Sequence, residues 1–218
     1  MFVQNMLFCF FVELNNHLRH TKPFLFAYIF LCIGAIYIQY SFTQESLSYA
    51  INSIHTPLLD VFCKYGTHIG DGLFFVVIAA CISFFDRKVA LVFIFTYLIS
   101  SVLAQGLKHL IFSDSLRPAM VLDLTHMHVV QGVEIRNYNS FPSGHTTSAF
   151  ALFALISFYT SNRLLQILSL VPAVFVGFTR IYLLQHFFED TLFGSLLGVI
   201  AAVVIYYSFY KLKPQENE

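Results

Sequence analysis

Long apolar runs separated by short polar stretches dominate this sequence. Five of the runs contain no charged residue and are 16 to 22 residues long: Pro23–Gln44, Val89–Leu107, Thr146–Asn162, Leu164–Thr179 and Thr191–Tyr210. A sixth apolar run lies near Tyr65–Phe85 and carries Asp71 near its start. Because a helix needs about 20 apolar residues to cross the ~30 Å core of a bilayer, the pattern predicts an all-α, integral membrane bundle of six transmembrane helices.

The first 22 residues differ from the other apolar segments. Their basic residues follow the apolar stretch, whereas those of a signal peptide precede it. Phe2, Met6 and Phe10 fall on one face of a helix, which is typical of an amphipathic helix lying in the membrane interface. We therefore expect an N-terminal interfacial segment over residues 1–22 and a single transmembrane domain over residues 23–218.

The composition agrees with a membrane protein and excludes other classes. Hydrophobic residues make up 57% of the 218 positions and charged residues only 11%, against about 25% charged residues in soluble domains. Twelve Lys and Arg balance twelve Asp and Glu, whereas nucleic-acid-binding proteins carry a basic excess. A disordered chain would combine high net charge with few hydrophobic residues. The expected partner is the lipid bilayer, with no nucleic acid, and the oligomeric state stays open.

The distribution of basic residues predicts the orientation in the membrane. Basic residues of short loops and tails are enriched on the cytoplasmic side. Alternating the loops across six spans places seven of the twelve on one side: Arg19, Lys22, Arg87, Lys88, Arg163, Lys211 and Lys213. Both termini are therefore predicted to be cytoplasmic, and the compact chain with its short loops suggests a bacterial inner membrane. The opposite, periplasmic or outer side receives the other five: Lys64, Lys108, Arg117, Arg136 and Arg180.

The longest stretch without a predicted helix runs from Lys108 to His145 on the outer side. Loops of this length inside a compact fold are usually functional or disordered. His126 and His128 in this loop are potential metal ligands, but solvated side chains are the favoured interpretation. The segment Thr67–Gly72 either lines the mouth of a site or, as we favour, forms a turn that opens the second helix.

Three polar clusters fall on the outer side, each at the end of a predicted span. They are Lys108 with Arg117-Pro118, Pro142-Ser143-Gly144-His145, and Arg180 with His186 and Asp190. Guanidinium and ammonium groups are suited to binding phosphate oxygens. Pro-Ser-Gly-His before an apolar helix predicts a helix N-terminus, whose free amides favour an anion.

The histidines complete a set of groups for phosphoryl transfer. His186 and Asp190 are four residues apart, so on a helix they share one face. A carboxylate that holds one imidazole nitrogen leaves the other basic and directed, as in nucleophile–base–orienter arrangements. His145 supplies a second imidazole able to protonate a leaving oxygen. This inventory fits phosphoryl transfer without a metal.

These residues resemble the motifs of the type-2 phosphatidic acid phosphatase superfamily, the membrane-integral lipid phosphate phosphatases related to vanadium haloperoxidases. The family's motifs are Lys-x6-Arg-Pro, Pro-Ser-Gly-His and Ser-Arg-x5-His-x3-Asp, in that order. The second is intact here, and the third has Thr179 in place of Ser. In the first, eight residues instead of six separate Lys108 from Arg117. The resemblance covers roughly residues 50 to 205.

The resemblance implies a role for each matched residue and hydrolysis of a phosphate monoester or diphosphate on a membrane lipid. His186 would attack phosphorus and form a phosphohistidine, Asp190 would orient it, and His145 would protonate the leaving group. The phosphate oxygens would be held by Lys108, Arg117, Ser143, Gly144 and Arg180. The family requires no metal or organic cofactor.

Alternatives remain open at this stage. A lipid-to-lipid phosphotransferase would use the same histidine, and a small transporter would use His and Asp as a relay. The transporter alternative predicts ionisable residues near helix midpoints, whereas these fall at helix ends. Phosphatidic acid, phosphatidylglycerol phosphate, polyprenyl diphosphate and a lipid A phosphate all fit as substrates.

Overall fold

The computed structural model describes the backbone of residues 2–211 and the side chains of residues 21–209. Over these residues the chain is helical with no strand, as predicted. The elements are α1 (Phe2–Ser41), α2 (Gln44–Ser53), α3 (Pro57–Gly66), a 3-10 turn η1 (Thr67–Gly70), α4 (Gly72–Ser83), α5 (Arg87–Gly106), a π-helical turn η2 (Leu107–Ile111), α6 (Pro118–Val121), a 3-10 turn η3 (Leu124–His126), α7 (Gly144–Phe158), α8 (Arg163–Leu168), α9 (Leu170–Tyr182) and α10 (Phe188–Lys211).

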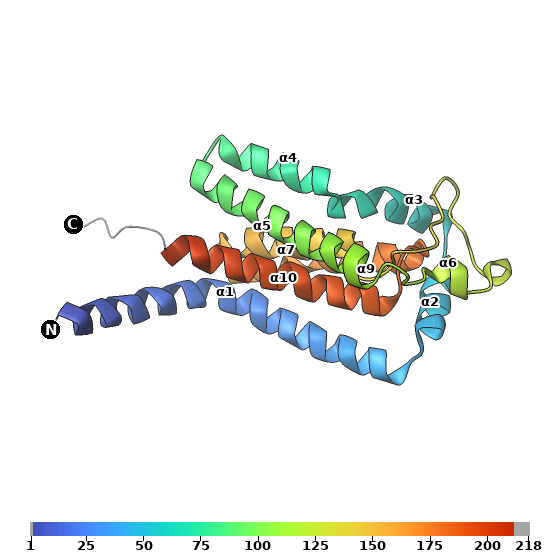
Figure 1. Cartoon of the computed structure of the whole chain (residues 1–218), viewed down its shortest axis with the longest axis horizontal. Helices are drawn as coiled ribbons and strands as arrows, with labels where there is room; N and C mark the ends of the chain where they lie inside the picture. The colour runs from blue at the N-terminus through green and yellow to red at the C-terminus, as the bar shows by residue number, and fades with distance from the viewer. Residues whose placement is uncertain (1, 212–218) are drawn as a thin grey trace.

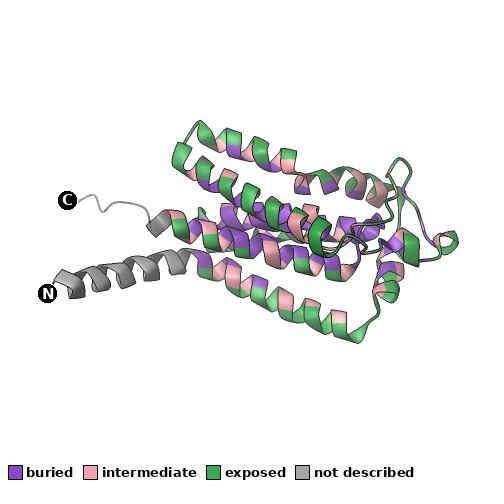
Figure 2. Ribbon diagram, in the orientation of Figure 1, coloured by how far each residue is buried: buried purple, intermediate pink, exposed green. Residues whose placement is uncertain are grey.

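The long helices form a bundle around α7. Helices α1, α4, α5 and α10 run along the long axis of the molecule, and α2, α3 and α6 gather with the long loop at one end (Figure 1). Buried residues concentrate on the central helices, while the outer faces of α1, α4 and α5 are exposed (Figure 2). These outer faces carry large apolar side chains such as Phe30 and Leu73. Such a surface suits lipid, not water.

Helix α7 can occupy the centre because its neighbour α10 presents glycines to it. A Cβ atom at Gly194 would lie 2.7 Å from the backbone oxygen of Ser143, and one at Gly198 would collide with the backbone oxygen of Thr147. Small residues at four-residue spacing allow helix backbones to approach closely in membranes. The backbones of α7 and α10 therefore pack closely through Gly194 and Gly198.

The described residues hold four helices long and apolar enough to cross a membrane: Thr21–Ser41, Arg87–Ile111, Arg163–Tyr182 and Phe188–Phe209. A fifth is present if the pair Pro57–Gly70 and Gly72–Ser83, bent by 58°, counts as one span. The sixth predicted span is the apolar α7, which has 15 residues. The chain is thus a multi-pass integral membrane protein, and the count of six stays a prediction.

Two predicted spans differ from straight helices for local reasons. The span near Tyr65–Phe85 breaks at Asp71, whose backbone is extended (φ −71°, ψ 144°) between η1 and α4. The span Leu164–Thr179 is interrupted at Ser169 between α8 and α9. Pro172 lacks the amide that would bond the carbonyl four residues earlier, which accounts for this second interruption. Apolar runs alone do not reveal such breaks.

The loop between η2 and α7 is ordered by contacts with helices α2, α3 and α9. Asn52 of α2 donates to the backbone oxygen of His128 and accepts from its amide, at 2.8 and 2.7 Å. The His128 ring lies 2.8 Å from a carboxylate oxygen of Asp60 and stacks on His55 at 4.0 Å. The expectation of solvated histidines is therefore wrong for His128, because tertiary packing supplies partners. It holds for His126, whose side chain is 77% exposed.

The predicted interfacial face of Phe2, Met6 and Phe10 lies outside the described side chains. Helix α1 extends over Phe2–Ser41 and thus includes the first residues of the predicted transmembrane domain. The interfacial segment over residues 1–22 therefore stays a prediction.

Candidate active site

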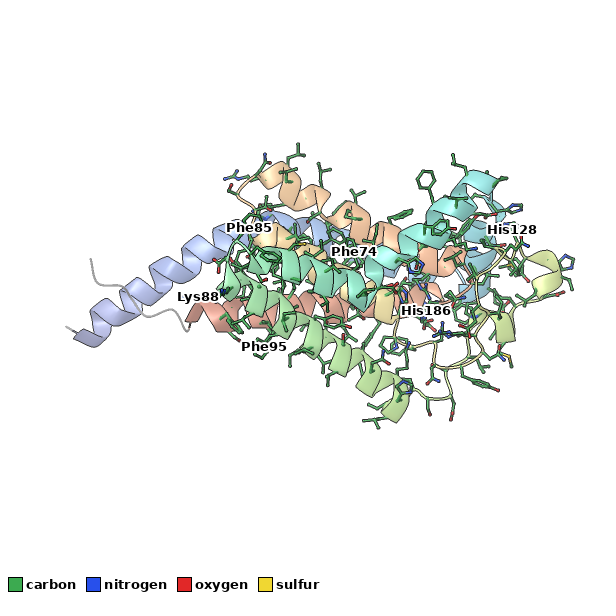
Figure 3. All side chains as sticks on the ribbon, turned by 90° about the horizontal axis from the view of Figure 1, so that it is seen from above. Phe74, Phe85, Lys88, Phe95, His128 and His186 are labelled. Carbon is green, nitrogen blue, oxygen red and sulfur yellow. The ribbon has the colours of Figure 1, made fainter. Side chains whose placement is uncertain are left out.

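The predicted site residues converge on a cavity of about 220 Å³ at one end of the bundle. His186 lies toward this end, and Phe85 and Lys88 lie at the opposite end (Figure 3). Six of the eight predicted residues line the cavity: Lys108, Arg117, Gly144, His145, Arg180 and His186. Ser143 and Asp190 are not among the lining residues and act on neighbours that are.

His186 lies in the turn before α10 and not on the helix itself, contrary to the prediction. The amides of Gln185 and His186 both donate to the backbone oxygen of Arg180, at 2.9 and 3.2 Å. Leu184 adopts a positive φ of 56°, a conformation that costs a non-glycine residue roughly 1–2 kcal/mol. Burial of Leu184 against Leu122 and Met127 offsets this cost. The turn places His186 at the base of the cavity.

Asp190 holds His186 even though only Asp190 is helical. The His186 Nδ1 lies 3.3 Å from Asp190 Oδ2, and both side chains are 2% exposed. The same carboxylate oxygen accepts hydrogen bonds from the Phe187 amide at 2.9 Å and from the Ser140 hydroxyl at 2.5 Å. With Nδ1 facing the carboxylate, Nε2 of His186 is the nitrogen left free to act on a ligand.

His145 occupies the first turn of α7 on the cavity wall. Its Nε2 lies 2.6 Å from Asp71 Oδ1, at the break between η1 and α4. Gly70, Asp71 and Gly72 also line the cavity. The segment Thr67–Gly72 therefore forms the expected turn before the helix and also lines the site, the interpretation that we did not favour. The two imidazoles of the cavity are thus each held by a carboxylate from a different element.

The N-terminus of α7 faces the cavity through Gly144. Ser143 is its N-cap, and the Ser143 hydroxyl lies 2.9 Å from the Thr146 hydroxyl and accepts from the Thr146 amide. The first amides of a helix lack intrahelical partners, and the cap satisfies that of Thr146, while the amide of Gly144 at the start of α7 is another of this group. These amides and the positive end of the helix dipole favour an anion. Ser143 therefore caps the N-terminus of α7, while Gly144 and His145 line the cavity next to it.

Two cations keep donors available for an anion in the cavity. Lys108 is 8% exposed, and its ammonium has no hydrogen-bond partner within the described part of the chain. Arg180 is 7% exposed and donates from one terminal nitrogen to the Thr67 hydroxyl at 2.8 Å. The Nε of Arg180 is buried without a partner among the described residues. A buried donor left unpaired is costly, so Arg180 is prepared for an anionic ligand, and Lys108 lines the same cavity.

Arg117 is engaged differently, because backbone oxygens already hold its guanidinium. Nε donates to Tyr138 at 2.9 Å, one terminal nitrogen to Gln185 at 2.8 Å and the other to Asn139 at 3.1 Å. Burial and the nearby Arg136 lower the pKa of Arg117 to about 10, so it is still a cation near neutral pH. Arg117 therefore joins the loop to the turn that carries His186 while lining the cavity.

Burial and the cluster of cations together determine the charge state of the nucleophile candidate. Burial, together with the positive charges of Arg180, Arg117 and Lys108, holds the pKa of His186 well below its usual range. An imidazole in that environment stays neutral and keeps a nucleophilic lone pair. Among the described residues, no group of three or more His, Cys, Asp or Glu side chains is arranged to hold a metal ion.

Three residues of the site were not predicted by their motifs. Ser140 binds the carboxylate of Asp190, Asp71 binds His145, and Arg136 lines the cavity from the loop. Ser140 lies only two residues before the Pro-Ser-Gly-His motif, and its position there is the one available signal. For Asp71 the signal was the segment Thr67–Gly72, since one of the two interpretations of that segment placed it at the mouth of a site.

The apolar helical bundle indicates a membrane-integral protein. A cavity that combines two imidazoles with buried cations is the kind of site expected of a phosphatase. A family model described as the PAP2 superfamily matches residues 89–214, more than half of the chain. The chain therefore belongs to the PAP2 superfamily, which confirms the resemblance found in its motifs.

Similar proteins and structures agree with this assignment. Phosphatidylglycerophosphatase B of Bacillus subtilis (strain 168) is 28% identical over 191 residues, 81% of this chain and 88% of that protein. Lipid phosphate phosphatase 1 of Arabidopsis thaliana is 33% identical over 86 residues, 34% of this chain and 26% of the relative. The match thus spans only about a quarter of that protein's length.

Two solved structures share the fold. The crystal structure of Aquifex aeolicus LpxE superposes with a TM-score of 0.66 and 26% identity, covering 74% of this chain and 93% of that one. The structure of a transmembrane PAP2 type phosphatidylglycerolphosphate phosphatase from Bacillus subtilis gives a TM-score of 0.59 and 25% identity, covering 89% of this chain and 99% of that one.

Proposed function

We propose that this protein hydrolyses a phosphate monoester or diphosphate on a membrane lipid through a phosphohistidine intermediate. The observation that carries the proposal is the buried His186–Asp190 pair, 3.3 Å apart, beside a cavity lined by Lys108 and Arg180. The names of the similar proteins, which include a phosphatidylglycerophosphatase and a lipid phosphate phosphatase, support a lipid phosphate as substrate.

The first half-reaction forms the intermediate. His186 Nε2 attacks phosphorus while Asp190 stabilises the positive charge that develops on the ring. The bond between phosphorus and the lipid oxygen breaks, and His145 donates a proton to that oxygen, so the lipid alcohol leaves neutral. Lys108, Arg180 and the Gly144 amide bind the phosphoryl oxygens, whose charge is spread over the transition state.

The second half-reaction releases phosphate. Water attacks the phosphorus of phosphohistidine, and His145, now neutral, takes a proton from that water. The bond between nitrogen and phosphorus breaks, and both histidines return to their starting states. No step requires a metal, so we propose a metal-independent hydrolase.

The location of the site follows from the predicted charge asymmetry. We propose six transmembrane helices in one domain over residues 23–218, with α7 and the bent α3–α4 pair as the two unusual spans. The cavity lies on the periplasmic or outer side, and both termini are cytoplasmic in a bacterial inner membrane. The lipid head group would reach the cavity while its tail stays among the helices.

The test is release of inorganic phosphate from a short-chain phosphatidic acid by detergent-solubilised protein. His186→Ala should abolish release, whereas His126→Ala, an exposed loop histidine, should retain it. Wild-type rates in His186→Ala would contradict the mechanism. Loss of activity with a chelator would contradict metal independence, and transfer of phosphate to an added lipid alcohol instead of water would identify a phosphotransferase.

A further inference from the structure

We propose that Asp71 is a positioning residue for His145. The inference rests on the proposed function, since it gives His145 the role of general acid. Its carboxylate holds Nε2 of the imidazole, so that Nδ1 is the nitrogen presented to the oxygen of the leaving lipid alcohol. Asp71 would do for the acid what Asp190 does for the nucleophile.

The contacts of Asp71 are those of an orienting group. Oδ1 lies 2.6 Å from His145 Nε2, and Oδ2 lies 2.5 Å from His68 Nδ1. Each carboxylate oxygen is therefore occupied by one imidazole, and the carboxylate is fixed from both sides. The His68 side chain is 64% exposed, whereas that of His145 is 32% exposed. The three residues form a chain from solvent to the cavity.

The side chain of Asp71 contacts the imidazoles instead of forming a helix-capping hydrogen bond. Asp71 occupies the N-cap of α4, where an aspartate normally accepts from an amide of the first turn. Its side chain makes no such capping hydrogen bond and reaches the imidazoles instead. The approach also needs a glycine, because a Cβ atom at Gly70 would lie 2.7 Å from the backbone oxygen of His145.

The chemistry of the step requires a partner of this kind. Burial and the nearby Arg180 disfavour the protonated imidazole of His145, and the carboxylate of Asp71 opposes them by favouring it. When the bond between phosphorus and the lipid oxygen breaks, the proton on Nδ1 moves to that oxygen. The proton on Nε2 stays in the hydrogen bond, and Asp71 remains a carboxylate throughout. Asp71 lies outside residues 89–214, the part of the chain that matches the family model.

The experiment compares two leaving groups with Asp71→Asn. An alkyl phosphate such as octyl phosphate releases a strongly basic alkoxide that needs a proton, whereas 4-nitrophenyl phosphate releases a weakly basic phenolate that does not. General acid catalysis contributes about 10²–10⁴-fold, so we expect kcat/KM on the alkyl phosphate, which reports the first half-reaction, to fall about 10- to 100-fold. The kcat/KM on the aryl phosphate should stay within about threefold of wild type, because the second half-reaction, in which His145 acts as a base, does not enter this ratio. Asp123→Asn, at an exposed loop carboxylate, is the matched control and should leave both rates unchanged.

A mutant cycle gives an independent readout. If Asp71 acts through His145, Asp71→Asn should cost little further activity in a His145→Gln background, because residues that act as a unit are not additive. An unchanged rate on the alkyl phosphate, an equal loss on both substrates, or additive losses in the cycle would overturn the inference while leaving the proposed function in place. If the wild-type protein hydrolyses neither substrate nor phosphatidic acid, it is the proposed function that fails.

His68→Gln extends the test to a residue outside the cavity lining. Because the His68 side chain is 64% exposed, we expect this variant to fold even if Asp71→Asn does not. Loosening one side of the carboxylate should lower the rate on the alkyl phosphate about two- to fivefold and spare the aryl phosphate. Wild-type rates on both substrates would contradict a fixed carboxylate.

Discussion

At the scale of single residues, the site places several positively charged side chains in a buried environment. Lys108, Arg117 and Arg180 are all buried next to His186, an arrangement that is unfavourable until an anion enters. Burial, reinforced by these cations, lowers the pKa of His186 and keeps its imidazole neutral. A phosphate ligand therefore relieves the repulsion among the cations and meets an unprotonated nucleophile.

The charge state of His186 can be observed directly. Because burial and the three cations lower its pKa, the ring should remain neutral well below the ordinary histidine pKa of about 6.5. Ring resonances of nitrogen-labelled histidine in the ligand-free protein would be followed from pH 8 to pH 5 by NMR. The His186 signal is identified by its absence in His186→Ala. Half-protonation at pH 6.5 or above would contradict the charge environment described here.

The sequence predicts the residues that occupy motifs and misses those that arrive by tertiary contact. The motif spacings of the sequence are sufficient to predict roles for His145, His186, Asp190 and Arg180. The structure places Ser140 and Asp71 on the same groups from a loop end and a helix break. Their roles depend on how η1 and the long loop fold against α7 and α10, which no local pattern encodes.

At the scale of elements, the contact between α7 and α10 fixes the geometry of the reaction groups. Helix α7 carries His145, and α10 begins just after His186. The backbone amide of Ser143 donates to the backbone oxygen of Asp190 at 3.1 Å. Gly194 and Gly198 then bring the two helices together along their length. His186, the proposed nucleophile, and His145, the proposed acid, are thus both held by the contact between these two helices.

Substituting Gly198 tests this pair. In Gly198→Ala the new methyl group would collide with the backbone oxygen of Thr147, and overpacking of this kind costs about 1–3 kcal/mol. The melting temperature in detergent should fall, by roughly 2–4 °C per kcal/mol for a chain of this length. Gly34→Ala is the matched control, because nothing lies within 4 Å of a Cβ atom there, and alanine is the better helix former. Equal melting temperatures for Gly198→Ala and wild type would contradict this prediction, because α7 and α10 would then accept the methyl group without loss of stability.

Apolar runs predict where helices lie but not where they break. The spans over α1, α5 and α10 follow from uninterrupted hydrophobicity. The 58° bend at Asp71 and the π-helical turn that carries Lys108 do not. Both irregularities lie on the cavity, where the backbone departs from a regular helix to direct a charged side chain inward.

At the scale of the whole molecule, the two ends of the bundle differ in chemistry. Lys88 lies at one end, and His186 lies toward the other together with the loop that contains His128 (Figure 3). The predicted excess of basic loop residues at the first end supports the proposal that this end is cytoplasmic. The buried cations at the other end line the cavity and are not exposed loop residues. They therefore do not count against this orientation.

Labelling with a membrane-impermeant maleimide tests the orientation. In a variant whose four native cysteines are replaced, His126→Cys should react in intact bacterial cells, because that side chain is exposed in the outer loop. Lys88→Cys at the start of α5 should react only after the cells are permeabilised. The reverse pattern would place the cavity in the cytoplasm and contradict the proposed topology.

The guanidinium of Arg117 has a consequence for how a ligand and the loop influence each other. It binds backbone oxygens of Tyr138, Asn139 and Gln185 while lining the cavity. A phosphate that engages its remaining N–H groups would also strengthen the connection between the loop and the turn of His186. Because such coupling is reciprocal, loosening the loop far from the cavity would weaken phosphate binding by the same free energy.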